Sequence, residues 1–183
     1  MAPMSLKNLL VEQQKEIAEK WIQAVSGTYP FSTVGFLRTK SDPFINPVGQ
    51  RNKVAAESFV AALLADEPDQ EELSEVIDEF IKVRAIQNFC PEDAVGIILA
   101  LKPIINEVLG DKLVRHIKEH GLTEYRLLEG RIDAINLLAF GAYVRCREKV
   151  AEMRIDEFKR RHSQIIRQAE RVLNEKFPEH RLK

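Results

Sequence analysis

Apolar residues recur every three or four positions along a proline-free stretch from about Leu122 to Phe177. This spacing places them on one face of a helix, and a helix of that length, at about 1.5 Å per residue, extends far beyond one small domain. Its later part keeps alternating steps of four and three, which is the pattern of a coiled-coil seam. We therefore expect a helical head (residues 1–140) and a stalk (residues 141–183). The predicted seam, which would face a partner helix, consists of Ala151, Ile155, Phe158, His162, Ile165, Ala169 and Val172.

Shorter runs with the same helical period fill the chain before this stretch, and strand-like alternation is absent. The pattern predicts an all-α fold. Ser5 can cap a first helix that reaches about Val25 and ends at Gly27. Further helices are expected at about residues 50–65, 70–88, 91–109 and 111–119. The run at 91–109 is apolar nearly all round, which is typical of a central buried helix, and we expect Pro103 to bend it.

A long irregular segment, residues 26–49, separates the first two predicted helices and contains three prolines. Each residue that precedes a proline is forced out of the α region, so the segment has a stiff path. It is too apolar for disorder. We expect it to be structural, with Phe44 and Val48 inserted among the helices.

Charge is divided unevenly along the chain. The first 144 residues hold 15 Lys+Arg against 21 Asp+Glu, whereas residues 145–183 hold 12 against 7. A solvated helix of mixed charge accounts for the basic stalk, and an acidic partner or nucleic acid is the alternative. Aromatic side chains that would stack on bases are sparse in the stalk, which disfavours nucleic acid.

Targeting signals are not evident. The N-terminal residues have no long apolar run of the signal-peptide type, and no run approaches the roughly 18–20 apolar residues that span a bilayer. The two cysteines, Cys90 and Cys146, form no CxxC motif. We expect both to be reduced in a cytoplasmic protein.

Candidate chemistry is sparse. His116 and His120 share a helix face at i and i+4, a spacing that can hold a metal or present a haem ligand. No HExxH motif and no third ligand are evident, so a solvated pair of histidines is the favoured interpretation. Cys90 precedes a helix start, where a thiolate would be stabilised. The chain has no GxSxG, P-loop or GxGxxG motif, and we predict that it is no enzyme and needs no metal or cofactor.

Two polar residues interrupt the apolar surface at the end of the third predicted helix. Arg84 and Gln87 lie three apart and so occupy neighbouring positions on one face. Polar groups there need partners if they are buried. We expect Arg84 either to pair with Asp42, which would lock the proline-rich segment, or to line a small anion-binding sensor pocket.

Two segments carry a family resemblance: DPFINPVG at residues 42–49 and IKVRAIQNFCPEDAV at residues 81–95. Together they resemble the N-terminal domain of RsbRD-type proteins, the RsbT co-antagonists of bacterial stressosomes. The resemblance covers about Leu6–Leu138. It implies an all-α, globin-like sensor module without haem, dimeric, with a helix that leads toward a STAS output domain. It transfers no catalytic residue.

The chain shows no αβ segment of the STAS type after the stalk. We therefore expect a sensory or scaffolding module that dimerises through its last helix and either stands alone or acts on a separate output protein. The alternative is a small all-α protein that binds haem or a metal through a histidine of the head.

Overall fold

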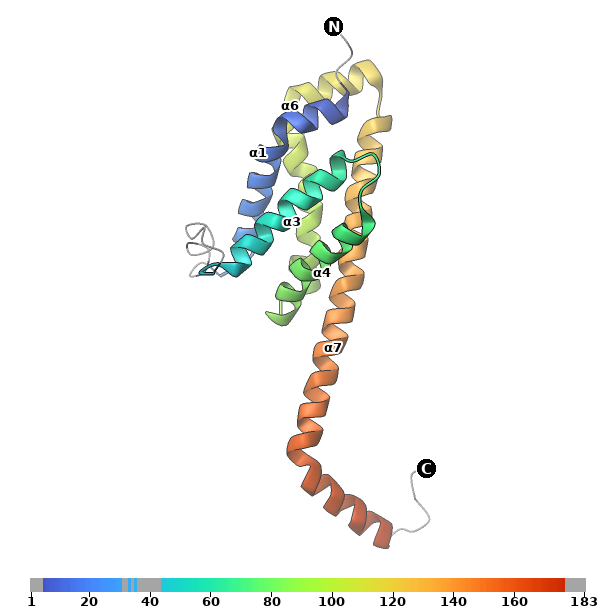
Figure 1. The fold of residues 1–183 in the computed structure, drawn as a ribbon. Helices are drawn as coiled ribbons and strands as arrows, with labels where there is room; N and C mark the ends of the chain where they lie inside the picture. Colours follow the sequence, from blue (N-terminus) through green and yellow to red (C-terminus); the bar gives the residue numbers. More distant parts are fainter. Residues whose placement is uncertain (1–4, 31–32, 34, 36–43, 177–183) are drawn as a thin grey trace. The chain divides into compact units, whose positions relative to one another are not determined.

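A computed structural model of the chain describes residues 5–30, 33, 35 and 44–176. Every regular element within these ranges is a helix, which confirms the predicted all-α fold (Figure 1). The chain divides into two compact units, Met1–Cys146 and Arg147–Lys183.

The first unit is built from helices of ordinary length that pack around one core. α1 contacts α3 and α6, and α3 also contacts α4 (Figure 1). The last helix, α7, begins in this unit and continues in the second. The elements are α1 (Leu6–Gly27), α3 (Pro47–Leu64), α4 (Gln70–Ile86), α5 (Pro91–Val95), the 3-10 helix η1 (Gly96–Ala100), α6 (Leu101–His120) and α7 (Thr123–Lys176).

Side-chain caps define where the helices begin. The Ser5 hydroxyl accepts a hydrogen bond from the Asn8 N–H, as predicted for the start of α1. Asn46 caps α3 by accepting from the Gly49 N–H at 2.8 Å. Pro47 follows in the first turn, where a backbone N–H would have no partner within the helix, so its absence costs no hydrogen bond. α3 therefore begins three residues before the predicted start at residue 50.

The apolar run at 91–109 is not one helix, and this prediction is wrong. The 3-10 helix η1 separates α5 from α6. Pro103 consequently lies in the first turn of α6, where a backbone N–H has no partner within the helix. The kink in α6 lies instead at Gly110, whose φ of 47° and ψ of −126° are non-helical. Glycine tolerates this conformation because it has no Cβ.

An aromatic cluster occupies the core of the first unit. Trp21 is fully buried, and its ring centroid lies 5.4 Å from that of Phe59 and 5.5 Å from that of Phe80. The Trp21 indole N–H donates to the Ile97 carbonyl oxygen at 2.9 Å, which joins α1 to η1. The cluster therefore contributes both apolar burial and a polar contact to the packing of four elements.

The predicted insertion of Phe44 among the helices is wrong, because its side chain is 97 % exposed. Val48, at the start of α3, packs against the core as expected. We predict that Phe44→Ala changes the free energy of unfolding by less than about 0.5 kcal/mol, as is usual for an exposed site. Urea denaturation would measure it, and a loss of several kcal/mol would show that the ring is buried in solution.

The first part of α7 is held in the first unit by a buried apolar stripe and by polar contacts. Its buried residues are Leu128, Ile132, Ile135, Ala139, Ala142 and Tyr143. Lys102 of α6 contacts Asp133 at 2.7 Å, and Arg145 contacts Asp78 of α4 at 3.0 Å. The Tyr143 hydroxyl donates to the Phe89 carbonyl oxygen at 2.8 Å, which joins α7 to the turn between α4 and α5.

The second unit, Arg147–Lys183, is described as helix as far as Lys176. Its apolar side chains are largely exposed within the single chain. Among the described residues of both units, no helix is long and apolar enough to cross a membrane.

Candidate functional site

Arg84 lies in the last turn of α4, and its side chain is completely buried. Its Nη2 donates to the Thr28 hydroxyl at 2.8 Å and to the Asp93 carbonyl oxygen at 2.7 Å, which joins the ends of α1 and α4 to α5. Gln87, the C-cap of α4, is exposed and so does not share this interior. Asp42 lies outside the described residues, and its pairing with Arg84 stays a prediction.

Three aromatic rings surround the Arg84 guanidinium. Its central carbon lies 4.3 Å from the ring centroid of Phe89, 5.4 Å from that of Phe80 and 5.5 Å from that of Tyr29. Burial lowers the pKa of Arg84, because removal from water disfavours the charged form. The faces of the rings offset part of that penalty through cation–π attraction.

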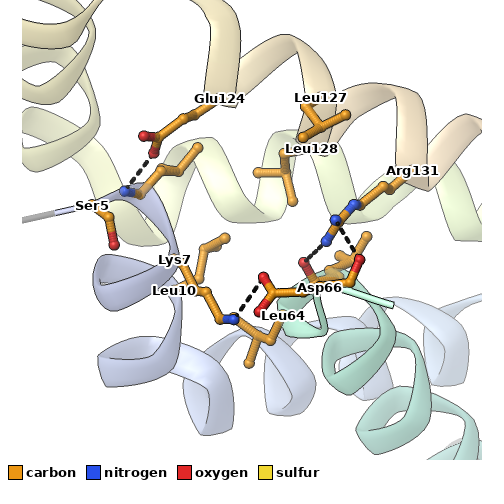
Figure 2. Close-up of a pocket in the computed structure, with 11 residues that line it drawn as sticks. Ser5, Lys7, Leu10, Leu64, Asp66, Glu124, Leu127, Leu128 and Arg131 are labelled. Atoms are coloured by element: carbon orange, nitrogen blue, oxygen red, sulfur yellow. Dashed lines mark hydrogen bonds and ion pairs between the residues drawn. The ribbon is translucent and has the colours of Figure 1, made fainter. Parts of the chain in front are cut away.

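A pocket of about 250 Å³ lies where the start of α1, the end of α3 and the start of α7 meet (Figure 2). Its apolar lining consists of leucines and its rim carries charged side chains. Four of those leucines, Leu6, Leu10, Leu63 and Leu128, are buried, and Leu127 is exposed at its edge. Sequence reasoning missed this pocket because it forms from helix ends that are far apart in the chain, and only the helix boundaries hinted at it. The complete lining is Ser5, Leu6, Lys7, Leu10, Leu63, Leu64, Asp66, Glu124, Leu127, Leu128 and Arg131.

Arg131 holds the end of α3 at one side of this pocket (Figure 2). Its guanidinium donates to the carbonyl oxygens of Leu63 at 3.0 Å, Ala65 at 2.6 Å and Asp66 at 3.3 Å. The last carbonyls of a helix have no partner within it, so a cation placed there is favourable. The contact also fixes α7 against α3.

We predict that Arg131→Met lowers the free energy of unfolding by about 1–3 kcal/mol, because hydrogen bonds from a charged group are lost. Lys7→Met is the matched control. Lys7 pairs with Asp66 at 2.9 Å beside the same helix end, but both side chains are well exposed, so its loss should cost less than about 1 kcal/mol. Urea denaturation of both variants measures the difference, and equal losses would contradict the capping role of Arg131.

The Glu124 carboxylate lies beside the starts of two helices, α1 and α7. It lies in the first turn of α7 and accepts the N–H of Leu6, the first residue of α1, at 2.9 Å (Figure 2). Negative charge is favoured at both positions because each helix start presents unpaired N–H groups. Its Oε2 also lies 3.3 Å from the Nε2 of His116 on α6.

The expectation that His116 and His120 are both solvated is wrong for His116, which is buried between α6 and its neighbours. Its ring stacks on that of His120 at a centroid distance of 4.7 Å. Among the described residues, no group of three His, Cys, Asp or Glu side chains is arranged to hold a metal ion.

Cys90, the N-cap of α5, is exposed and does not have the activated thiol suggested by its position at a helix start. The Asp93 backbone N–H favours the thiolate, but the carboxylates of Glu92 and Asp93 outweigh it, so the pKa of Cys90 is raised. A raised pKa leaves less of the nucleophilic thiolate at neutral pH.

The predicted seam of α7 lies in the second unit. Ile155, Phe158, Ile165 and Val172 are exposed within the single chain, and His162 is half-buried. The His162 ring stacks on that of Phe158 at 4.2 Å, and its Nδ1 lies 2.9 Å from the Phe158 carbonyl oxygen.

The described part of the chain is thus an all-α protein whose long last helix, α7, exposes apolar side chains to solvent. The RsbT co-antagonist protein rsbRD N-terminal domain matches residues 15–157, and the chain belongs to this family. The family indicates a stress-signalling module and a regulatory role.

An uncharacterised protein of Archaeoglobus fulgidus is 27 % identical over 150 residues, which are 79 % of this chain and 83 % of that protein. No solved structure matches the chain.

Proposed function

We propose that the protein is a non-catalytic, cytoplasmic regulator of stress signalling that works as a homodimer through the seam of α7. Membership of the family supports the signalling role. The dimer is our inference from the chain's own residues, and so is action on a separate output protein.

The exposed seam is the observation that carries this proposal. Ile155 is 53 % exposed and Ile165 is 65 % exposed in the single chain, and Phe158 and Val172 on the same face are also apolar and exposed. His162 is the polar member of the seam. A lone helix buries little of such a stripe, and most helical stability in proteins comes from packing an apolar face. The alternation of four and three residues is the spacing that a parallel or antiparallel partner helix requires.

The same spacing, interrupted by the charged residue Glu148, continues upstream in the part of α7 that belongs to the first unit. Leu127, Leu137 and Val144 fall on it and are exposed. Between them, Gly130, Ala134 and Gly141 also fall on it. Small residues let two helix backbones approach closely, so this stretch is suited to helix pairing as well.

Light scattering on the purified chain tests the proposal. A dimer has twice the 21.0 kDa mass of the single chain, and we expect that mass at micromolar concentration. A monomer at all accessible concentrations would overturn the homodimer and leave the apolar seam for a different partner.

A further inference from the structure

The pocket of Figure 2 presents an apolar lining that a ligand can reach. It lies where the start of α1, the end of α3 and the start of α7 meet, and its volume is about 250 Å³. Six leucines line it. Two of them keep contact with solvent, since Leu64 is half-buried and Leu127 is 60 % exposed. Apolar surface in contact with water favours an apolar occupant, because both surfaces lose unfavourable hydration when they meet.

The charged side chains at the rim of this pocket already have partners within the protein (Figure 2). Lys7 pairs with Asp66 at 2.9 Å, and Arg131 donates to carbonyl oxygens at the end of α3. The pKa of Asp66 is lowered, first by its bond with Lys7 and also by Arg131, so the carboxylate stays ionised beside both cations. Glu124 accepts the Leu6 N–H at 2.9 Å. The two cations and two carboxylates balance, so a charged ligand would lose hydration without gaining a counterion.

The volume of the pocket sets the size of the ligand. An engineered apolar cavity of about 150 Å³ admits benzene, which has six heavy atoms. By proportion, a pocket of about 250 Å³ admits about ten heavy atoms. One polar group fits at the rim, because the Ser5 hydroxyl there can both donate and accept a hydrogen bond.

We propose that this pocket binds a neutral aliphatic molecule of about ten heavy atoms with one hydroxyl-like polar end. The aliphatic part contacts leucines of α1, α3 and α7 together, so binding stabilises the docking of these three helix ends. The site thereby supplies a chemical signal to the helix that continues into the seam. It goes beyond the proposed function and does not depend on the oligomeric state, so a monomeric protein would not overturn it.

The experiment titrates n-octanol into the intact chain, whose leucine methyl groups carry an isotope label for NMR. We expect saturable shifts of the methyl signals of three leucines that line the pocket, Leu10, Leu64 and Leu128. Leu73 of α4 and Leu101 of α6 lie outside the lining, and their signals should not shift. The melting temperature should rise with the n-octanol concentration, because the ligand binds the folded state.

Two further probes test the chemical class of the ligand. Each methylene that leaves water strengthens binding about fourfold, so n-butanol, which is four methylenes shorter, should bind about two hundredfold more weakly. Sodium octanoate keeps the chain length and replaces the hydroxyl end with a carboxylate. Since the rim offers this charge no counterion, we expect octanoate to bind at least about tenfold more weakly than n-octanol.

Paired variants separate the pocket from general effects of the alcohol. Leu64→Phe narrows the pocket, so we expect the affinity for n-octanol to fall at least about tenfold. Leu99→Phe is the matched control. It makes the same exchange on η1, where Leu99 is exposed and lies outside the lining, and it should bind n-octanol as the wild type does. The series of probes needs no variant, so it decides the proposal even if Leu64→Phe does not fold.

Three results would overturn the proposal. The first is a titration in which the pocket leucines shift no more than Leu73 and Leu101. The second is an affinity for octanoate that equals that for n-octanol, and the third is equal binding by Leu64→Phe and Leu99→Phe. A variant that begins at Ser5 tests a different occupant. If only this variant binds n-octanol, residues 1–4 of the chain fill the pocket themselves, and an external ligand is ruled out.

Discussion

Replacing both Ile155 and Ile165 with aspartate is expected to convert the proposed homodimer into monomers of 21.0 kDa. Both isoleucines belong to the seam, and burial of one such side chain contributes about 1.5–3 kcal/mol. The dimer would lose four of these contributions and gain four charges in an apolar interface. The dimer dissociation constant should rise at least about a thousandfold. Light scattering across a dilution series measures this.

A matched variant carries the same two added charges outside the seam. Met153 and Gln164 lie on the same helix but off the seam spacing, and both are exposed. Met153→Asp with Gln164→Asp should leave the dimer intact. If both double variants keep the wild-type mass, the dimer does not use this seam. If the seam variant instead loses thermal stability as a monomer, the stripe packs on its own chain.

Trp21→Ala should destabilise the first unit by about 3–5 kcal/mol, the range for truncating a buried aromatic side chain. The residue is fully buried between Phe59 and Phe80. Its removal leaves a cavity at the contact of α1, α3 and α4, and it also leaves the Ile97 carbonyl without its indole partner. Chemical denaturation followed by circular dichroism measures the change.

Trp21→Phe separates the two contributions. It retains a ring in the aromatic cluster and removes the N–H, so we expect a smaller loss, about 1–2 kcal/mol. If Trp21→Ala unfolds at the wild-type denaturant concentration, the cluster is not the core of the unit. If Trp21→Phe is as damaging as Trp21→Ala, the hydrogen bond outweighs the packing.

Local signals in the sequence located most helices. Ser5 is a cap because its hydroxyl can accept a hydrogen bond from a nearby N–H, and α3 ends before the acidic segment at residues 66–69, whose Pro68 cannot continue a helix. Such local signals could not show that the apolar run at 91–109 divides into α5, η1 and the first part of α6. Its residues suit an α-helix and a 3-10 helix equally, and the choice depends on contacts such as that of Trp21 with Ile97. Phe44 was misplaced because hydrophobicity alone does not tell which side of a turn faces the core.

The candidate sites show a similar limit. Arg84 stood out because a cation interrupts an apolar helix face, and that signal is local. Tyr29 and Phe89 gave no signal, since each is unremarkable in its own segment and gains meaning only where its ring meets the Arg84 guanidinium. The pocket of Figure 2 is a further case, because its walls come from residues 5–10, 63–66 and 124–131.

The bond between Glu124 and the Leu6 N–H joins residues 118 positions apart. As the chain is synthesised, α1 emerges early, but its first turn lacks this acceptor until α7 has begun to form. Contacts of such long range slow folding, because the intervening chain must first be ordered. The start of α1 should therefore gain its final protection from hydrogen exchange late, together with the docking of α7. The rate of amide exchange at Leu6 during folding would then report when the whole first unit has assembled.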